Sequence, residues 1–396
     1  MLVQKYRDML SGKSVIRELS EFATARGQEI GYENVYDFSL GNPSVPAPRE
    51  FTGAMMGMLR DMGANELHGY SPSLGITSVR EAVAASLEKR FGLPYRKEHI
   101  FMAVGAAGAL AHAFRLVTEP GDEILTFAPF FPEYHPYVDL TGAKLKVVPP
   151  DTENFQIHFG KLEEMLTDKV MAVLINTPNN PSGVVYSADT LRRLADLLRT
   201  KSDEYKHPIY LISDEPYREI VFAGVEAPCV SQFYDNTVMC YSFSKSLSIP
   251  GERIGYVAVN PRCRDAVDMV NMCGQISRGI GHNCPPSMIQ LAVAQVLDKT
   301  ADLSVYETNM NLLYHELTAL GFFCVKPGGT FYIFPRALEE DAKAFCRKAL
   351  KYDLILVPGD SFGAPGYFRM AYCIDTEKVE RSLGALRKFV AEVYKG

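Results

Sequence analysis

Short apolar runs rich in β-branched residues alternate with amphipathic stretches between about residue 80 and residue 260. Within this region Leu191, Leu194, Leu197 and Leu198 form one apolar stripe at helical spacing, and Ser187 is a candidate helix cap before it. Strands that alternate with helices are typical of a mostly parallel sheet, here of seven strands, covered by helices. The predicted strands are Phe101–Val104, Glu123–Phe127, Lys144–Val148, Val170–Ile175, Pro208–Ile212, Val238–Tyr241 and Ile254–Val259.

The pattern changes after about residue 287. A long helical stretch is followed by predicted strands at Phe322–Val325, Thr330–Phe334 and Leu354–Val357, with helical stretches between them. This order predicts a second, smaller α+β domain. We therefore expect residues 1–48 to form an N-terminal arm and part of the small domain, 49–287 the large domain, and 288–396 the small C-terminal domain.

Composition narrows the possible partners. Lys and Arg total 41 against 47 Asp and Glu, which gives a net charge of −6. The sequence also has no dense run of basic residues that could follow a phosphate backbone, so we expect no nucleic acid partner. The N-terminus lacks the apolar stretch of a signal peptide or membrane span, which predicts a cytoplasmic protein without a membrane partner. The eight cysteines are irregularly spaced without a C-x-x-C pair, as in proteins with reduced thiols. Histidines do not pair with acids or thiols at metal-ligand spacing, so no metal is expected.

The segment from Tyr241 to Arg253, YSFSKSLSIPGER, carries the strongest chemical signal. It begins at the end of a predicted strand and places Lys245 among several serines, with Arg253 eight residues further on. A lone lysine is usually a solvated surface residue. Hydroxyls and a guanidinium beside a partly buried amine, however, suit a phosphate next to a nucleophilic lysine, because burial favours the neutral, reactive amine.

A second signal lies upstream, where the apolar strand ending at Ile212 runs into Ser213-Asp214-Glu-Pro-Tyr217. By itself, an acid at the carboxyl end of a parallel strand could simply cap the next helix.

Together these segments resemble the class I/II aminotransferases, the fold-type-I pyridoxal-phosphate enzymes, and the resemblance covers nearly the whole chain. The matching segments follow the family's order. They are Ser39-Leu-Gly41-Asn-Pro, Gly69-Tyr70-Ser-Pro-Ser-Leu-Gly75, Val104-Gly105-Ala-Ala107, Asn176-Thr-Pro-Asn-Asn180-Pro-Ser-Gly183, Ser213-Asp214-Glu-Pro-Tyr217, Ser242-Phe-Ser-Lys245 with Arg253, and Phe368-Arg369-Met.

The resemblance implies that the large domain binds pyridoxal 5′-phosphate and that Lys245, Asp214 and Tyr217 are catalytic. Lys245 would be the Schiff-base lysine and would move a proton between the substrate α-carbon and the C4′ atom of the cofactor. Asp214 would pair with the pyridine nitrogen and keep it protonated. Tyr217 and Asn180 would donate hydrogen bonds to the phenolic oxygen.

The resemblance also implies where the ring and the phosphate are held. Phe131 matches the residue that stacks on the pyridine, with Phe130 as a close competitor. The phosphate would lie at the N-terminus of a helix that begins near Gly105. Its expected ligands are the amides of Gly105, Ala106 and Ala107 and the side chains of Ser242, Ser244 and Arg253. Ser244 could equally be a structural hydroxyl.

Three further positions match residues that serve the substrate or a partner subunit. Tyr70 matches a tyrosine that reaches the phosphate of the neighbouring subunit, which implies a homodimer with shared active sites. Arg369 would bind the substrate α-carboxylate through a bidentate pair, although a surface arginine is the alternative. Gly41 matches a backbone site beside that carboxylate, and Asn180 would also contact the substrate.

The implied function is transfer of an amino group from an L-amino acid to a 2-oxo acid by a ping-pong mechanism, as part of amino acid metabolism. Some bacterial relatives that act on aspartate carry a lysine where this chain has Ala107, which disfavours aspartate here. Arg17 and Arg278 are candidate cations for a distal carboxylate, and aromatic or large neutral substrates stay open. The alternative on the same fold is a β-eliminating carbon–sulfur lyase. A DNA-binding regulator would need a helical module before Gly41, for which the sequence shows no pattern.

Overall fold

The computed structural model describes residues 2–11 and 15–395. Its contacts divide the chain into two compact units. Unit 1 consists of residues 1–44, 181–183 and 304–396, and unit 2 of residues 45–180 and 184–303.

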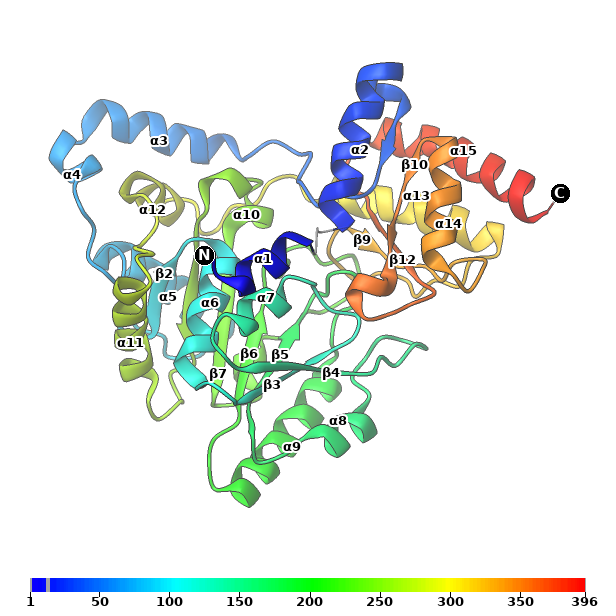
Figure 1. The fold of residues 1–396 in the computed structure, drawn as a ribbon. Helices are drawn as coiled ribbons and strands as arrows, with labels where there is room; N and C mark the ends of the chain where they lie inside the picture. The colour runs from blue at the N-terminus through cyan, green and yellow to red at the C-terminus, as the bar shows by residue number, and fades with distance from the viewer. Residues whose placement is uncertain (1, 12–14, 396) are drawn as a thin grey trace. The chain divides into compact units, whose positions relative to one another are not determined.

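Unit 2 contains a seven-stranded sheet in the order β2-β8-β7-β6-β5-β3-β4 (Figure 1). Neighbouring strands from β7 to β4 are parallel, and only β8 runs antiparallel to both of its neighbours. All seven predicted strands are present. Their bounds are β2 Ile100–Ala103, β3 Glu123–Phe127, β4 Lys144–Val148, β5 Val170–Asn176, β6 Tyr210–Asp214, β7 Thr237–Ser242 and β8 Gly255–Val259.

Helices cover both faces of this sheet. Ile212 and Leu174 face a core shared with α6, α7 and α11, whereas Val173 and Leu211 face a core shared with α8 and α9. The helices are α3 Arg49–Asp61, α4 Ala64–His68, α5 Thr77–Phe91, α6 Gly105–Val117, α7 Tyr134–Asp139, α8 Phe159–Met165, α9 Ala188–Tyr205, α10 Phe243–Ser246, α11 Ala266–Gly279 and α12 Ser287–Ala294, with 3-10 turns at Lys97–His99, Val230–Gln232 and Pro250–Glu252. The fold class predicted from the sequence is therefore confirmed.

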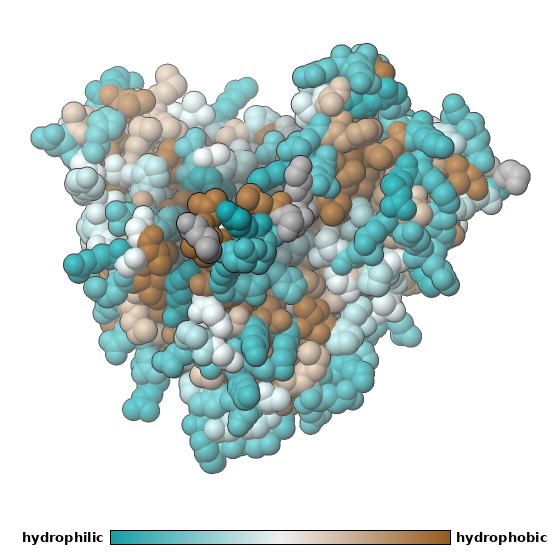
Figure 2. Space-filling view, viewed as in Figure 1, coloured by the Kyte–Doolittle hydropathy of each residue, from teal (hydrophilic) through white to brown (hydrophobic). Residues whose placement is uncertain are grey.

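Helix α9 shows how the sequence pattern produced this arrangement. Leu191, Leu194 and Leu198 are buried on one face, and the Ser187 hydroxyl accepts a hydrogen bond of 3.0 Å from the Thr190 amide, as predicted. Hydrophilic residues cover the outer surface around α8 and α9, at the bottom of Figure 2. Burial of the leucine stripe holds the helix on the sheet.

Unit 1 combines helices with two small sheets. Strands β1 and β10 pair in parallel, and β11-β12-β9 form an antiparallel sheet. The strands are β1 Tyr36–Asp37, β9 Tyr332–Ile333, β10 Leu354–Ile355, β11 Val357–Pro358 and β12 Phe368–Ala371. The helices are α1 Gln4–Ser11, α2 Val15–Ile30, α13 Ser304–Leu320, α14 Ala342–Ala349 and α15 Thr376–Tyr394, with 3-10 turns at Tyr32–Asn34, Leu350–Tyr352 and Gly359–Phe362.

The predicted strand at Phe322–Val325 is wrong, since these residues have no strand geometry. The Phe322 amide donates to the carbonyl of Leu317 and ends α13. The Phe322 ring is buried against Phe345 and Phe368. The apolar run therefore reflects packing of an irregular segment, which a two-residue period cannot distinguish from a strand.

The domain boundaries also differ from those expected at residues 48 and 287. Helix α12 and the residues up to 303 belong to unit 2, because Ile289 and Val293 are buried in the same core as Phe51 of α3 and Val83 of α5. Residues 181–183 group with unit 1, where the carbonyl of Gly183 accepts hydrogen bonds from the amides of Gly328 and Gly329. Contacts of this kind join segments that are distant in sequence.

No helix within residues 2–11 and 15–395 is long and apolar enough to cross a membrane. All eight cysteines are free, and six of them are buried, as the prediction of reduced thiols requires.

Candidate active site

The carboxyl ends of the parallel strands bring several of the predicted residues to one edge of the unit 2 sheet. Asn176, the last residue of β5, is paired in register with Asp214, the last residue of β6. Asp214 is paired in turn with Cys240 of β7, whose last residue, Ser242, precedes Lys245. Ligands of open α/β sheets bind at this edge.

Asp214 is buried, with 4% of its surface exposed. Its Oδ2 atom accepts a hydrogen bond of 2.6 Å from the hydroxyl of Tyr134 and lies 3.4 Å from the Nδ2 atom of Asn176. Its Oδ1 atom is also buried and has no hydrogen-bond partner within the part of the chain that the structure describes. One carboxylate oxygen is thus fixed while the other is available to a ligand, because a buried polar atom requires a partner.

The pKa of Asp214 is raised from its ordinary 3.8 to about 7, mainly by burial. The hydrogen bond from Tyr134 lowers this pKa, and the charge of the neighbouring Glu215 raises it further. Glu215 is itself buried and forms an ion pair of 2.7 Å with Arg218. A cation at Oδ1 would restore the charged form of Asp214, since an opposite charge in a dry site strongly favours ionisation.

Lys245 lies on the four-residue helix α10, directly after β7, and is half-buried. The Ser242 hydroxyl caps this helix by accepting from the Ser244 amide at 3.1 Å, and it donates to the Ser244 hydroxyl at 2.8 Å. Both serines are buried. The local fold therefore fixes the backbone on which Lys245 stands.

The predicted phosphate ligands meet at the start of α6. A methyl group on Gly105 would lie 2.8 Å from the Nη2 atom of Arg253, so only glycine leaves room for this guanidinium. Gly105 also has a φ of 71°, in the left-handed region. The Arg253 Nη1 atom donates to the carbonyl of Pro250 at 2.9 Å, which orients the side chain. A helix N-terminus beside a guanidinium could hold an anion, and Ala106 and Ala107 are the next residues of this first turn.

Strand pairing connects this anion site to Lys245. Gly255, the first residue of β8, pairs with Ser242, directly before α10, and with Ala103, two residues before α6. A methyl group on Gly255 would lie 2.2 Å from the carbonyl oxygen of Tyr241. A glycine is thus required where the two strands and α6 approach most closely.

Four other predicted residues of unit 2 differ in their exposure. Phe130 is in the core with 4% exposure, whereas Phe131 is half-buried and its ring makes an edge contact with Tyr134 at 5.7 Å. Tyr217 is buried at 5%. Tyr70, in contrast, is fully exposed and lies outside this cluster. Phe131 is therefore the phenylalanine with an accessible face.

Arg369 and Gly41 come together within unit 1. Arg369, on β12, is 2% exposed, and its Nη2 atom donates to the carbonyl of Ser39 at 2.5 Å. Its guanidinium lies 4.6 Å from the ring centre of Tyr332 and 4.9 Å from that of Phe362. The Tyr332 hydroxyl occupies the space that a side chain on Gly41 would need. The guanidinium is thus held between two aromatic faces.

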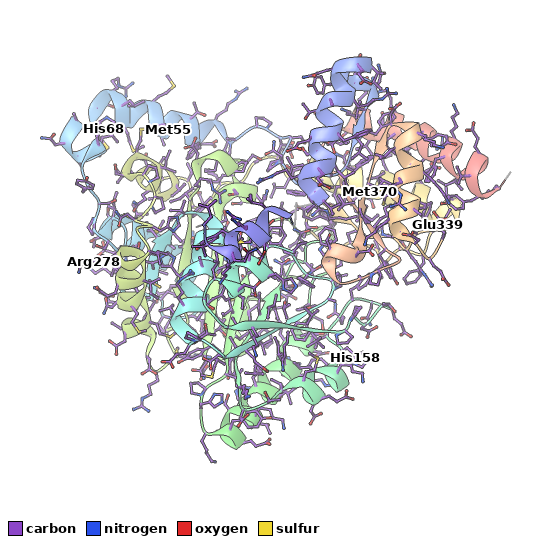
Figure 3. All side chains as sticks on the ribbon, in the orientation of Figure 1. Met55, His68, His158, Arg278, Glu339 and Met370 are labelled. Atoms are coloured by element: carbon purple, nitrogen blue, oxygen red, sulfur yellow. The ribbon has the colours of Figure 1, made fainter. Side chains whose placement is uncertain are left out.

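The two arginines considered for a distal carboxylate are both exposed in the chain. Arg17 lies on α2, and Arg278 lies on α11 at the left of Figure 3. Neither is among the residues described above around Asp214 in unit 2 or around Arg369 in unit 1.

Sequence reasoning missed the residues that support these side chains. Tyr134 and Asn176 contact Asp214, and Tyr332 and Phe362 enclose Arg369. The available signals were weak: Tyr134 comes three residues after Phe131, and Asn176 comes four residues before Asn180. Such spacings do not reveal a contact across the sheet.

The residues of unit 2 fit pyridoxal phosphate on chemical grounds. Asp214 offers a buried carboxylate oxygen for a cationic ring nitrogen, and the start of α6 with Arg253 offers donors for a phosphate. Lys245 offers an amine directly after β7, the strand that lies between β6 and β8 in the sheet.

Comparisons with known proteins agree. The profile of the family "Aminotransferase class I and II" matches residues 33–386. An aromatic-amino-acid aminotransferase of Thermococcus litoralis is 31% identical over 96% of each chain, and an aspartate aminotransferase of Thermotoga maritima is 29% identical over 95% of this chain and 99% of its own.

Solved structures show the same likeness. The crystal structure of an amino transferase from Eubacterium rectale is 43% identical over 100% of both chains, with a TM-score of 0.96. That of the Thermotoga maritima aspartate aminotransferase is 28% identical over 96% of this chain and 97% of its own, with a TM-score of 0.86. The chain therefore belongs to the class I and II aminotransferase family.

Proposed function

We propose that this pyridoxal-phosphate-dependent aminotransferase carries out its reaction with Lys245, Asp214 and Tyr217 as the catalytic residues. The observation that carries this proposal is the buried Oδ1 atom of Asp214, which has no partner among the described residues and lies at the same sheet edge as Lys245. An unsatisfied buried carboxylate is costly to the fold, so a ligand cation accounts for its position.

Pyridoxal phosphate, when bound, supplies an electron sink for the bond that breaks at the substrate α-carbon. Asp214 would pair with the ring nitrogen and hold a proton there, as this chemistry requires. Lys245 would hold the cofactor through its amine and would move a proton at the substrate α-carbon. The Ser242 hydroxyl caps the short helix that carries Lys245 and so fixes the backbone from which its amine extends.

The remaining residues of unit 2 orient the ring. Tyr217 and Asn180 would donate to the phenolic oxygen, and Phe131 would pack against the ring face. The amides of Gly105, Ala106 and Ala107, with Ser242, Ser244 and Arg253, bind the phosphate. In unit 1, Arg369 binds the substrate carboxylate beside the Gly41 backbone, with Asn180 as a further contact. Two amino acids would use the same residues in turn, which gives ping-pong kinetics.

For the substrate, we favour aromatic or large neutral amino acids over aspartate. Ala107, at the start of α6, stands where some relatives that act on aspartate carry a lysine, and Arg17 and Arg278 are exposed. The relatives named above include both aspartate and aromatic-amino-acid enzymes, so a comparison of donors is the direct test.

We also infer a cytoplasmic homodimer with shared sites. Tyr70 is fully exposed, yet its loop is held by a 3.1 Å contact between Ser71 and Cys284 and by a 3.2 Å hydrogen bond from Gln290 to Ser71. An ordered loop that presents an aromatic hydroxyl to the outside suits a second subunit. The eight free cysteines suit a reducing compartment.

Mixed dimers test the shared sites. Tyr70→Phe and Arg253→Ala would each lower cofactor retention, and mixing the two variants should recover roughly a quarter to a half of the wild-type activity, because one composite site is then intact. Absence of any recovery, with dimers verified by light scattering, would contradict shared sites.

The principal test is the absorbance spectrum of the purified protein, recorded before and after single amino acids are added without an oxo acid. A visible cofactor band that shifts to the near ultraviolet establishes the half-reaction and ranks the donors. A band that persists while pyruvate and ammonia appear indicates the lyase instead. Lys245→Ala should lose the visible band and turnover while staying folded, whereas the exposed-lysine control Lys161→Ala should keep both.

A further inference from the structure

The face and two edges of the proposed cofactor ring are assigned to Phe131, Asp214 and Asn180. These residues come from different segments, after β3, at the end of β6 and after β5. Useful catalysis requires that they keep fixed positions relative to one another, since small displacements of binding groups are costly.

Tyr134 contacts two of the three. Its hydroxyl donates to Asp214 Oδ2 at 2.6 Å, and its ring makes an edge contact with the Phe131 ring at 5.7 Å and an interplanar angle of 84°. The side chain is fully buried, and burial raises the pKa of its hydroxyl well above the ordinary value. The hydroxyl therefore remains a donor throughout the neutral pH range.

Asn176 contacts Asp214 as well, together with Asn180. Its Nδ2 atom donates to the backbone carbonyl of Asp214 at 2.9 Å and lies 3.4 Å from Asp214 Oδ2. Its Oδ1 atom accepts from the Asn180 amide at 2.7 Å. One buried side chain thus satisfies groups of β6 and of the loop after β5, and fixes the distance between them.

We propose that Tyr134 and Asn176 are positioning residues that together hold Asp214 by Oδ2 and turn Oδ1 towards the ring nitrogen of the cofactor. This inference rests on the proposed function. In this proposal both residues act through Asp214. Both donors converge on the same oxygen, so a rotation of the carboxylate would break the bond from Tyr134 and weaken the contact with Asn176.

The test compares two ligands of the cofactor-free protein: pyridoxal phosphate and its analogue in which CH replaces the ring nitrogen. The two ligands differ at the ring nitrogen, so a change in the ratio of their dissociation constants between the wild type and a variant reports on the contact at Oδ1. We expect the wild type to bind pyridoxal phosphate at least about tenfold more tightly than the analogue.

Tyr134→Phe should reduce that ratio by about three- to tenfold and leave binding of the analogue almost unchanged. The matched control is Tyr234→Phe, which removes another buried hydroxyl, bonded at 2.7 Å to the carbonyl of Ile209 just before β6. It should keep the wild-type ratio. A residue that acts only through general stability would weaken both ligands equally.

A wild-type ratio in Tyr134→Phe would overturn the proposal, and so would equal affinity of the wild-type protein for the two ligands. Failure of the wild type to bind pyridoxal phosphate would instead refute the proposed function. If Tyr134→Phe does not fold, Asn176→Ala gives the second measurement, with Asn260→Ala as control because its amide also donates to two buried carbonyls. Asn176→Ala should lower the ratio, and an unchanged ratio would again overturn the proposal.

Discussion

Unit 2 and unit 1 each bury one charged side chain that the proposed mechanism uses, and their surroundings differ in kind. Asp214 is held by a hydroxyl and an amide, and burial raises its pKa to about 7. Arg369 lies against the aromatic rings of Tyr332 and Phe362 and donates to the carbonyl of Ser39.

The difference follows from the chemistry of the two groups. A guanidinium keeps its charge in any protein environment, so it can be enclosed by rings that attract it weakly. A carboxylate becomes neutral when it is buried without donors, so its charge depends on each hydrogen bond and on the ligand. We therefore expect that substitutions of the residues around Asp214 change its charge state. For Arg369, we expect substitution of the arginine itself to have the main effect.

Among changes to these two buried groups and their neighbours, the largest effect should come from Asp214→Asn, which keeps the shape but removes the charge. We expect turnover to fall by roughly 10²–10³-fold or more, as when one preorganised electrostatic partner is lost elsewhere. Steady-state kinetics of the cofactor-loaded protein measure the loss. Turnover within about threefold of wild type would show that the ring nitrogen does not need this acid.

Arg369→Gln should affect the substrate and leave the cofactor in place. Loss of a buried, bidentate partner costs about 2–5 kcal/mol, so kcat/KM for every amino acid should fall by about 30-fold or more. Arg369→Lys should recover only part of it, because an ammonium lacks the planar fork. The dissociation constant of pyridoxal phosphate, measured on the same protein, should stay within about twofold of wild type, and a large rise would contradict the separate roles.

The pH dependence of unfolding tests the buried acid without any activity. The pKa of Asp214 is about 7 in the folded cofactor-free protein and 3.8 ordinarily. Between these two pH values the folded protein therefore holds a proton that the unfolded chain has lost. Stability from this group is therefore present below pH 4 and decreases as the pH rises to about 7, by roughly 2–4 kcal/mol. Asp214→Asn should remove this decrease and unfold at higher denaturant concentration than wild type at pH 8.

The control for that experiment is Asp196→Asn on the surface of α9, where the carboxylate is mostly exposed and pairs with Arg199. Its unfolding should follow the wild-type pH profile. If Asp214→Asn were less stable than wild type at every pH, Asp214 would contribute to folding rather than oppose it.

The smallest expected effect is that of Tyr332→Phe. This change removes the hydroxyl that fills the space beside Gly41 and keeps the ring that faces Arg369. We expect KM for the amino acid to rise by a few fold, since the loss of one hydroxyl and its hydrogen bond typically costs about 1 kcal/mol. Tyr332→Leu, which also removes the aromatic face, should raise KM further, and equal effects of the two would show that the ring contributes nothing.

Much of this protein was readable from its sequence. The spacing of apolar residues predicted all seven strands of the main sheet and the capped helix α9, and the segments around Lys245 and Asp214 indicated the family and the cofactor. These features depend on local periodicity and on side-chain types at short, fixed spacings, which a single chain displays directly.

Only the tertiary structure decided the rest. The register of β5 with β6 brings Asn176 beside Asp214, and the turn after β3 brings Tyr134 to the same carboxylate. Likewise, Phe322 packs in an irregular segment where a strand was predicted, and α12 packs in the core of unit 2, beyond the boundary expected at residue 287. The physical reason is the same in each case: burial and hydrogen bonding between distant segments depend on which surfaces meet in three dimensions, and no periodicity along one segment records its partner.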